Sequence, residues 1–314
     1  MYRIGVDLGG TNIAVGLVDE EKKLVKKKSV PTGAERPAEQ IVDDIAAVCR
    51  ALCTEAGVPL SEIVSVGIAT PGIANHDTGV VEYANNLPFR KLPLADMLRE
   101  RLGVERVKIE NDANAAAWGE AVAGAAQGTR NSIMITLGTG VGGGIIIDNK
   151  VYSGFNYAGG ELGHIVIRVD GAPCSCGRHG CWEAYSSATA LIRMTREKIE
   201  ECEAEGRKTL MSKAEKISGR TACDAMRQGD AAAKEVYDLY IHYLASGLAT
   251  IINIFQPEVI SLGGGISNEG QSLIDSLLPI VRKEQYGGGV VPMTDIRIAR
   301  LGNDAGIIGA AMLG

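Results

Sequence analysis

Residues 4–19, IGVDLGGTNIAVGLVD, place two apolar stretches on either side of a glycine turn. Residues 133–148, IMITLGTGVGGGIIID, repeat that pattern, so that Gly9 aligns with Gly138. Each copy has the pattern of a strand, a tight turn and a second strand. Two glycine-rich hairpins can also match by chance, which is the alternative explanation. A true repeat predicts two related halves that face one another.

Strand and helix patterns alternate along the chain, which is typical of an α/β fold. The apolar run IVSVGIAT at residues 63–70 is followed by RVKIEN at residues 106–111, which leads into a helix. Helices are also expected near residues 37–56 and 230–255. In the latter, apolar residues recur at helical spacing and predict a core-facing stripe. The stripe consists of Val236, Leu239, Tyr240, Tyr243, Leu244, Leu248 and Ile251.

A chain of 314 residues with 46% hydrophobic and 22% charged residues is long enough for two domains. We expect a small α/β domain over residues 1–115, with a C-terminal helix at about 300–314 packing back on it. A large α/β domain then covers residues 116–299. No low-complexity linker separates the halves, so a hinge is expected near residues 110–130 and near residue 300.

The net charge of −6 and the pI near 5.4 do not favour nucleic acid or an anionic membrane as a partner. The first residues, MYRIGVDLGG, run directly into a strand pattern and do not resemble a signal peptide. No apolar run approaches membrane-spanning length. We therefore expect a cytoplasmic protein.

The glycine turns DLGGTN and LGTGVGGG suit phosphate binding, because backbone N–H groups can approach a phosphate where no Cβ intervenes. Neither is a GxGxxG fingerprint between strand and helix, nor a GxxxxGK[ST] loop. Tight hairpins also need glycine, so a purely structural role is the alternative. A third cluster, Gly263–Gly265, follows an apolar strand. Asp7, before the first turn, is either a ligand of hydrated magnesium or a turn-capping acid.

Four ligand-type residues lie close together in the pattern H-x9-C-x-C-x4-C. They form a complete tetrahedral set, which leaves no open position for water and therefore predicts a structural zinc site over residues 164–181. Free core cysteines are the alternative. The four residues are His164, Cys174, Cys176 and Cys181. The remaining cysteines are expected to be buried apolar residues; they are Cys49, Cys53, Cys202 and Cys223.

Two acids flank this segment, Glu161 in GGELGH and Glu183 in CWEAY. Carboxylates fixed by a metal-bound loop can accept hydrogen bonds from the vicinal hydroxyls of a sugar. His164 can bind zinc through one ring nitrogen and donate to a hydroxyl through the other. Acids on a surface loop are usually only solvated, which is the alternative.

The stretch ENDANAAAWGE, residues 110–120, places Asp112 at the beginning of an alanine-rich helix. There it is either the first residue or the cap, and the helix dipole favours its ionised form. Most such aspartates only cap a helix. A carboxylate that stays charged can also take the proton of an attacking hydroxyl.

Several motifs occur in the order that the ROK (repressor, open reading frame, kinase) sugar kinases have. The chain resembles the bacterial ROK glucokinases most closely. The resemblance implies an actin-like ATPase (ribonuclease H-like) fold with two domains around a central cleft, phosphorylation of glucose at the 6-hydroxyl, ATP, magnesium, structural zinc, and a homodimer or homotetramer. The motifs are DLGGTNIAVGL, ENDANAAAWGE, LGTGVGGGI, GGELGHIVI, CSCGRHGCWEAY and LGGGIS.

The resemblance also implies roles by position. Asp112 corresponds to the catalytic base. The sugar-binding positions are Asn85, Asn86, Asn111, Asp112, Glu161, His164 and Glu183. The positions for nucleotide and phosphate are Asp7, Gly9, Gly10, Thr11, Asn12, Thr139, Gly140, Gly264 and Gly265.

Other functions remain open at this stage. The segments TPG at residues 70–72 and NNLPF at residues 85–89 differ from the usual glucokinase pattern. A kinase for N-acetylmannosamine, N-acetylglucosamine, mannose or allose is therefore an alternative. A sugar-responsive repressor of the same family is disfavoured, because only six residues precede Asp7 and they hold no DNA-binding domain. A chaperone-like or filament ATPase would not need the cysteine segment.

Overall fold

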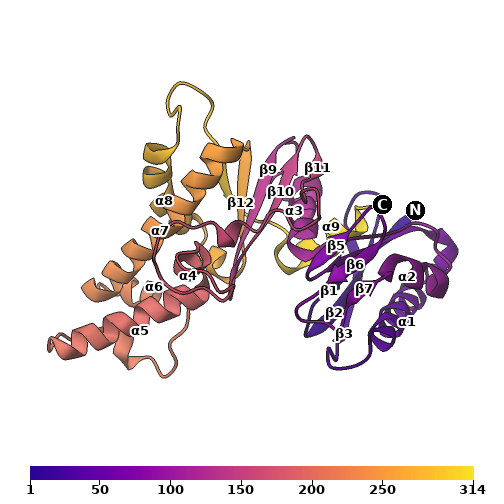
Figure 1. Ribbon diagram of the computed structural model, residues 1–314, viewed down its shortest axis with the longest axis horizontal. Helices are drawn as coiled ribbons and strands as arrows, with labels where there is room; N and C mark the ends of the chain where they lie inside the picture. The colour runs from indigo at the N-terminus through magenta and orange to yellow at the C-terminus, as the bar shows by residue number, and fades with distance from the viewer. The chain divides into compact units, whose positions relative to one another are not determined.

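The computed structural model describes residues 1–314, and its internal contacts divide the chain into two compact units (Figure 1). The first unit combines residues 1–134, 144–160 and 300–314. The second unit combines residues 135–143 and 161–299. The first unit is therefore assembled from the beginning, the middle and the end of the chain.

The first unit is built on a five-stranded sheet with the order β3-β2-β1-β4-β8. Strands β1, β2 and β3 are antiparallel neighbours, while β4 runs parallel to β1 and β8 parallel to β4. A small antiparallel sheet, β5-β6-β7, follows β4 in the chain. The strands are β1 (Tyr2–Leu8), β2 (Asn12–Val18), β3 (Leu24–Pro31), β4 (Ile63–Thr70), β5 (Ile73–Asn75), β6 (Val80–Tyr83), β7 (Arg90–Leu92) and β8 (Val107–Asn111).

Helices cover both faces of the large sheet of the first unit (Figure 1). Helices α1 and α2 pack together on one face, where Ile4 and Val6 share a buried cluster with Ile41 and Ile45. Helices α3 and α9 contact the strands from the other face. The helices are α1 (Ala38–Ala56), α2 (Leu94–Leu102), α3 (Asp112–Ala123) and α9 (Ala305–Ala311), with 3-10 turns at Leu60–Glu62 and Gly302–Asp304.

Glycines allow α9 to lie directly on the sheet and on α3. A Cβ atom at Gly67 of β4 would lie 1.7 Å from the backbone oxygen of Ala310, and one at Gly309 would lie 1.7 Å from that of Ala115. Backbone therefore packs on backbone at these two contacts. Since no side chain fits between them, the C-terminal helix has one position relative to β4 and α3.

A second five-stranded sheet has the order β11-β10-β9-β12-β13. Its hairpin β9–β10 occupies the place that β1–β2 has in the first sheet, in agreement with the sequence repeat. The division between the units passes through this hairpin, at residues 134/135 and 143/144. The strands are β9 (Ser132–Leu137), β10 (Val141–Ile147), β11 (Lys150–Val151), β12 (Val259–Gly263) and β13 (Asp295–Ile298).

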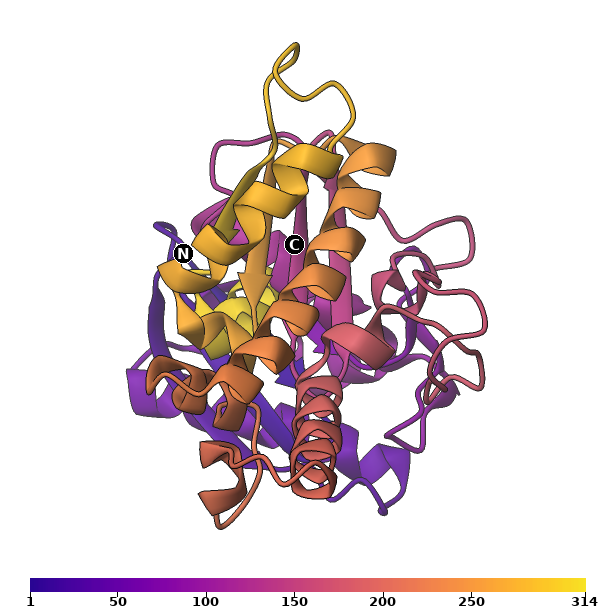
Figure 2. The same ribbon diagram turned by 90° about the vertical axis from the view of Figure 1, so that its left-hand side faces the viewer.

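The second unit contains most of the remaining helices. The longest, α7, begins where the side chain of Asp230 accepts the backbone N–H groups of Ala232 and Ala233, and it packs beside α8 (Figure 2). The helices are α4 (Glu183–Ser186), α5 (Ala188–Ala204), α6 (Thr221–Arg227), α7 (Ala231–Phe255) and α8 (Gln271–Glu284). The 3-10 turns are Leu162–His164, Leu210–Lys213 and Gly265–Glu269.

The structure differs from the predicted organisation at two places. Leu239 is 45% exposed, so the prediction that it belongs to the core stripe of α7 is wrong; it lies on the flank of the helix that no other element covers. The predicted division at residue 115 cuts through α3, whereas contacts with α9 keep all of α3 in the first unit. The functional roles of the two domains stay a prediction.

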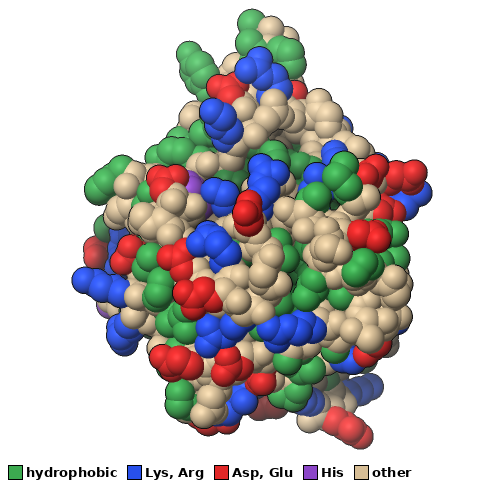
Figure 3. Space-filling view, turned by 90° about the vertical axis from the view of Figure 1, so that its right-hand side faces the viewer, with side chains coloured by type: hydrophobic (Ala, Val, Ile, Leu, Met, Phe, Trp, Pro, Cys, Tyr) green, Lys and Arg blue, Asp and Glu red, His purple; other side chains and the backbone are tan.

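None of the helices is long and apolar enough to cross a membrane. On the face seen in Figure 3, Lys and Arg side chains lie interspersed with Asp and Glu. Surface ion pairs of this kind include Arg101 with Asp43, which joins α2 to α1. Such exposed pairs contribute little to stability individually.

The packing of α9 predicts that one added methyl group on β4 lowers the stability of the protein strongly. Gly67→Ala should destabilise the protein by about 3 kcal/mol or more, because its Cβ would displace the backbone of α9. Gly219→Ala is the control, since its Cβ would meet only side-chain atoms, the end of Ile266 at 3.3 Å and the Cβ of Ala188 at 3.7 Å. Chemical denaturation of both variants measures the difference. Equal stability of the two variants would contradict the proposed packing.

Candidate active site

The beginning of α3 is organised by Asn111, which is the helix cap. Its side-chain oxygen accepts the backbone N–H groups of Ala113 and Asn114, at 3.0 and 3.2 Å. Its Nδ2 donates to the backbone oxygen of Gly72 at 3.1 Å. Asp112 is therefore the first residue of the helix, and its carboxylate is free of the capping role.

Asp112 is exposed to solvent on one side and packed against protein on the other. Burial of that side raises the pKa of its carboxyl above the usual range, although the Ala113 N–H, 2.9 Å from Oδ1, lowers it in part. The expectation that the helix start makes the ionised form more favourable than usual is thus wrong in its net direction. Desolvation outweighs the backbone donors here.

Asp7, at the end of β1, shares this region with Asp112. Burial, and then the charge of Asp112, raise the pKa of Asp7 to about 6. No protein group donates a hydrogen bond to its carboxylate, and Gly306 leaves room beside it, since a Cβ there would lie 2.9 Å from Oδ2. A mostly buried acid without a protein partner, close to a second acid, fits a role in holding a hydrated divalent cation.

The first glycine turn, Gly9–Asn12, is fixed by β3 and the loop that follows it. The Gly9 N–H donates to Asn12 O at 2.9 Å, and the Thr32 hydroxyl donates to Gly9 O at 2.7 Å. A Cβ at Gly10 would lie 3.2 Å from the Cβ of Asn86, so the structure brings this turn and the exposed Asn85–Asn86 pair together. The side chains of Thr11 and Asn12 remain exposed.

The second glycine turn, in the second unit, is fixed by Glu183. The Val141 N–H donates to Glu183 Oε2 at 3.0 Å, and the Thr189 hydroxyl donates to Thr139 O at 2.8 Å. A Cβ at Gly140 would lie 2.3 Å from the same carboxylate oxygen. The glycine is therefore required for Glu183 to reach the turn.

The third glycine cluster lies against the strand that precedes the second turn. Gly264 has φ +85°, and a Cβ there would lie 2.5 Å from the backbone oxygen of Leu137. Gly265 faces open space. The structure thus places Gly264 against Leu137, the last residue of β9, which precedes the turn that contains Thr139 and Gly140. A common nucleotide site at these residues stays a prediction.

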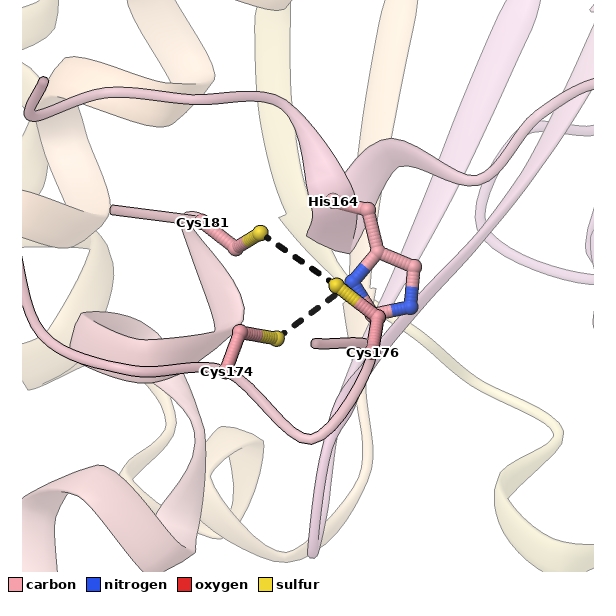
Figure 4. Close-up of side chains that lie close together, drawn as sticks. All are labelled: His164, Cys174, Cys176 and Cys181. Carbon is pink, nitrogen blue, oxygen red and sulfur yellow. Dashed lines mark hydrogen bonds between the residues drawn. The ribbon is translucent and has the colours of Figure 1, made fainter. Parts of the chain in front are cut away.

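His164, Cys174, Cys176 and Cys181 point toward one another (Figure 4), and their ligand atoms all lie within 4.8 Å of one another. The sulfurs of Cys176 and Cys181 are 3.7 Å apart, and His164 Nδ1 is 3.6 Å from the sulfur of Cys174. Tetrahedral zinc with zinc–sulfur bonds of about 2.3 Å holds its sulfurs about 3.8 Å apart. The four residues therefore fit a zinc ion.

The orientation of His164 agrees with the dual role expected for it. Its Nδ1 faces the sulfurs, so Nε2 is the nitrogen that remains for another partner. Burial raises the pKa of the Cys181 thiol to about 12. A metal ion that binds this sulfur would therefore have to displace the thiol proton. Metal binding at this cluster is accordingly coupled to proton release.

Glu183 connects the metal cluster to the glycine turn. Its Oε1 accepts the Ser175 hydroxyl at 3.1 Å and lies 3.7 Å from the sulfur of Cys174. Glu161 approaches the cluster only through its backbone, whose oxygen accepts the His164 N–H at 3.0 Å. Its exposed carboxylate makes no hydrogen bond within the protein, and the structure shows no contact between Glu161 and Glu183.

A pocket of about 420 Å³ lies between the second glycine turn and the cysteine segment. Besides Thr139, Gly140 and Glu183, it is lined by Ser175 and Arg193, which the sequence analysis did not select. Ser175 lies between Cys174 and Cys176, so its position in the cysteine motif could have identified it as a site residue. Arg193 is one of two arginines on α5, and nothing in its sequence context distinguishes it.

Comparison with known proteins identifies the family of this chain. The family model described as ROK family matches residues 3–314. The chain belongs to the ROK family. The resemblance found in the motifs is thereby confirmed over nearly the whole length.

Two glucokinases are among the most similar relatives of this ROK chain. The glucokinase of Streptomyces coelicolor is 40% identical over 99% of this chain and 96% of its own length. The glucokinase of Thermotoga maritima is 37% identical over the same shares. The crystal structure of a ROK family glucokinase from Streptomyces griseus in complex with glucose and AMPPNP is 38% identical, with a TM-score of 0.79 over 100% of this chain and 99% of that one.

These comparisons also confirm the predicted fold class. The mixed α/β architecture matches structures of ROK sugar kinases, which have the actin-like ATPase fold with two domains. The paired sheet orders in this ROK chain are consistent with that fold. The roles assigned to single residues stay predictions.

The cysteine cluster predicts one zinc ion per chain in protein purified without chelator, measured by elemental analysis. Cys174→Ser should reduce the zinc content at least tenfold, since thiolate ligands contribute much of the affinity. Cys53→Ala, in the core of the first unit, should keep the full content. A zinc content near zero in the unaltered protein would refute the assignment.

The raised pKa of Asp7 predicts that its charge destabilises the substrate-free protein. Since the pKa of Asp7 is about 6 in the folded protein and 3.8 for a free aspartate, the ionised form is disfavoured by folding, and the penalty is present above pH 6. Asp7→Asn should therefore raise stability at pH 8 by on the order of 1 kcal/mol, and this gain should vanish near pH 4. Thermal melting at both pH values measures it; an equal gain at both would contradict the cause given.

Proposed function

We propose that this ROK chain phosphorylates glucose at its 6-hydroxyl with ATP as the phosphoryl donor. The observation that carries the proposal is the first turn of α3, which presents Asp112 to solvent beside the buried carboxylate of Asp7. The similar glucokinases and the structure that holds glucose and AMPPNP, an ATP analogue, bear out the sequence-based prediction of a glucokinase.

In this proposal Asp112 accepts the proton of the sugar 6-hydroxyl as the oxygen attacks the γ-phosphorus. Because Asn111 caps the helix, the Asp112 carboxylate stays available to a hydroxyl. The upward shift of its pKa, caused by burial, makes its ionised form a stronger base than a free aspartate. Most of the acceleration comes from alignment of the reacting oxygen.

The glycine turns supply uncharged donors for the phosphates. Backbone N–H groups at Gly10 and Thr11, and at Thr139 and Gly140, are offered to the phosphoryl oxygens, and they need no reorganisation during transfer. Asp7 would hold the magnesium ion through its water shell. Magnesium, when bound, neutralises charge on the transferred phosphoryl group.

Sugar recognition is assigned to the residues that the family resemblance selected. Glu183 Oε1 faces the Ser175 hydroxyl and the Cys174 sulfur, whereas Oε2 accepts only the Val141 N–H and retains a lone pair for a hydroxyl. Asn111 uses its oxygen for the helix cap and one amide hydrogen for Gly72, so one amide hydrogen remains for a sugar oxygen. His164 offers Nε2. Asn85 and Asn86 are exposed beside the first turn and would contribute further contacts.

The metal ions, the oligomeric state and the cellular location of the enzyme belong to the same proposal. We expect one structural zinc and at least one magnesium ion in the active enzyme, a homodimer or homotetramer in solution, and a place in the cytoplasm. A different hexose, such as mannose, allose or an N-acetylated hexosamine, is the alternative substrate. A panel of these sugars with ATP, ADP and polyphosphate in a coupled assay distinguishes the alternatives.

The assignment of the base predicts the effect of Asp112→Asn. This variant should lose at least about 100-fold in kcat for glucose and ATP, with a KM for ATP close to that of the unaltered protein. Asp96→Asn is the matched control, since Asp96 forms only an exposed ion pair with Arg99. A variant at Asp112 that phosphorylates glucose at a near-normal rate would overturn the assignment.

A further inference from the structure

The backbone that leads into Asp112 rests on one buried carboxylate, that of Glu110 at the end of β8. Glu110 is only 3% exposed. Its Oε1 accepts the backbone N–H of Asn111 at 2.9 Å and the Nδ2 of Asn114 at 3.1 Å. Its Oε2 lies 2.9 Å from Nδ1 of His76, which must donate because an ionised carboxylate only accepts.

These contacts lie on both sides of Asp112 in the chain. Asn111 precedes Asp112, and Asn114 belongs to the first turn of α3 that follows it. One carboxylate oxygen therefore connects the end of the strand to the first turn of the helix. Together with the cap made by Asn111, this contact fixes the peptide groups that carry the Asp112 side chain.

Glu110 has no lysine or arginine partner, so His76 is its only ionisable hydrogen-bond donor. His76 follows β5 and is 33% exposed, at the edge of a cavity of about 330 Å³. The imidazole can thus exchange a proton with solvent, whereas the Glu110 carboxylate is shielded. A buried carboxylate is costly unless its hydrogen bonds are satisfied, and a charged partner lowers that cost further.

The charged and titratable groups around His76 come from four segments. Asp77 Oδ1 lies 3.8 Å from Nε2, and the Tyr157 ring packs edge-on with a centroid distance of 5.0 Å while its hydroxyl donates to Asp77. The hydrogen bond to Glu110 raises the pKa of His76, and burial and Lys108 oppose that shift. The groups are Glu110 and Lys108 on β8, Asp77 in the β5–β6 loop, Tyr157 in the loop before Glu161, and Lys150 on the cavity wall.

We propose that Glu110 is a positioning residue for Asn111 and Asp112, and that His76 is the charged partner that keeps the Glu110 carboxylate in place. The proposal rests on the kinase function proposed above for its kinetic readout. Neither residue touches substrate; each acts through the start of α3. A small tilt of that turn moves the base away from the reacting hydroxyl, which lowers kcat.

The pair also gives the reaction a pH dependence of its own. Because the pKa of His76 is raised in the folded protein, the stabilisation by its charge is complete below 6.5, the pKa of a free histidine, and is lost as the pH rises through the folded pKa. At higher pH the neutral ring still donates to Glu110, but the attraction between opposite charges is gone. Loss of the His76 charge therefore lowers the rate at alkaline pH, whereas protonation of Asp7 and Asp112 affects the rate at acidic pH.

The experiment compares His76→Asn, Glu110→Gln and the double variant in the full-length protein, from pH 5.5 to 9. Glu110→Gln keeps an oxygen for Asn111 and Asn114 but removes the charge that faces His76. We expect kcat to fall about tenfold at pH 6.5 in each single variant, with the KM for ATP unchanged and the alkaline decline reduced. Since the two residues act as a unit, the double variant should be no slower than Glu110→Gln alone.

His242→Asn and Glu105→Gln are matched controls, because both side chains are exposed and neither forms a hydrogen bond or an ion pair in the protein. Normal kcat in both single variants, or effects that multiply in the double variant, would overturn the proposal. A loss of thermal stability with unchanged kcat would also overturn it, because it would show a purely structural pair.

Amide hydrogen exchange tests the positioning role of Glu110 and His76 independently of the proposed kinase function. Both single variants should lose protection at residues 113–116 while α1 and β4 keep theirs. If no sugar and donor pair supports phosphorylation by the unaltered protein, the kinase proposal fails, yet this exchange measurement still decides on positioning. Unchanged protection at the start of α3 in both variants would refute the role of Glu110 in either case.

Discussion

The cap that Asn111 provides to α3 is the interaction on which the candidate site depends. Because Asn111 satisfies the free N–H groups of the first turn, Asp112 does not have to. Glu110 then fixes the same turn from the strand side. A carboxylate at a helix start is common, but here three consecutive residues divide the work: Glu110 positions, Asn111 caps, and Asp112, which accepts the N–H group of Ala113, keeps accepting capacity for chemistry.

Each half of the chain holds a glycine turn in place, but the two halves use different side chains to do so. Each sheet has a glycine turn between two neighbouring antiparallel strands, and an internal backbone hydrogen bond closes each turn. In the first unit Thr32 and Asn86 brace the turn. In the second unit Glu183 does so and also contacts Ser175 of the cysteine segment, so the cysteine segment and the second glycine turn are connected through one carboxylate. The first glycine turn has no such link to a set of cysteines.

Sequence patterns predicted what depends on local spacing. The hairpin repeat, the cysteine and histidine set and the helix at Asp112 are all short-range features, and the structure places them as expected. The net direction of the Asp112 pKa was not predictable, because desolvation depends on which distant residues pack nearby. Leu239 fits the helical period but lies where no element covers α7. His76 and Glu110 are 34 positions apart, so no spacing rule pairs them.

The last fifteen residues, Arg300–Gly314, complete a layer that begins with the first strand. Before residues 300–314 are in place, Gly5 and Gly67 lack the backbone of α9 as a partner, and the buried carboxylate of Glu120 lacks the N–H groups of Arg300 and Leu301. During synthesis, the layer that α3 forms on the N-terminal sheet therefore stays incomplete until this late segment has been made. A nascent chain of this topology depends on α9 for protection against misfolding and proteolysis.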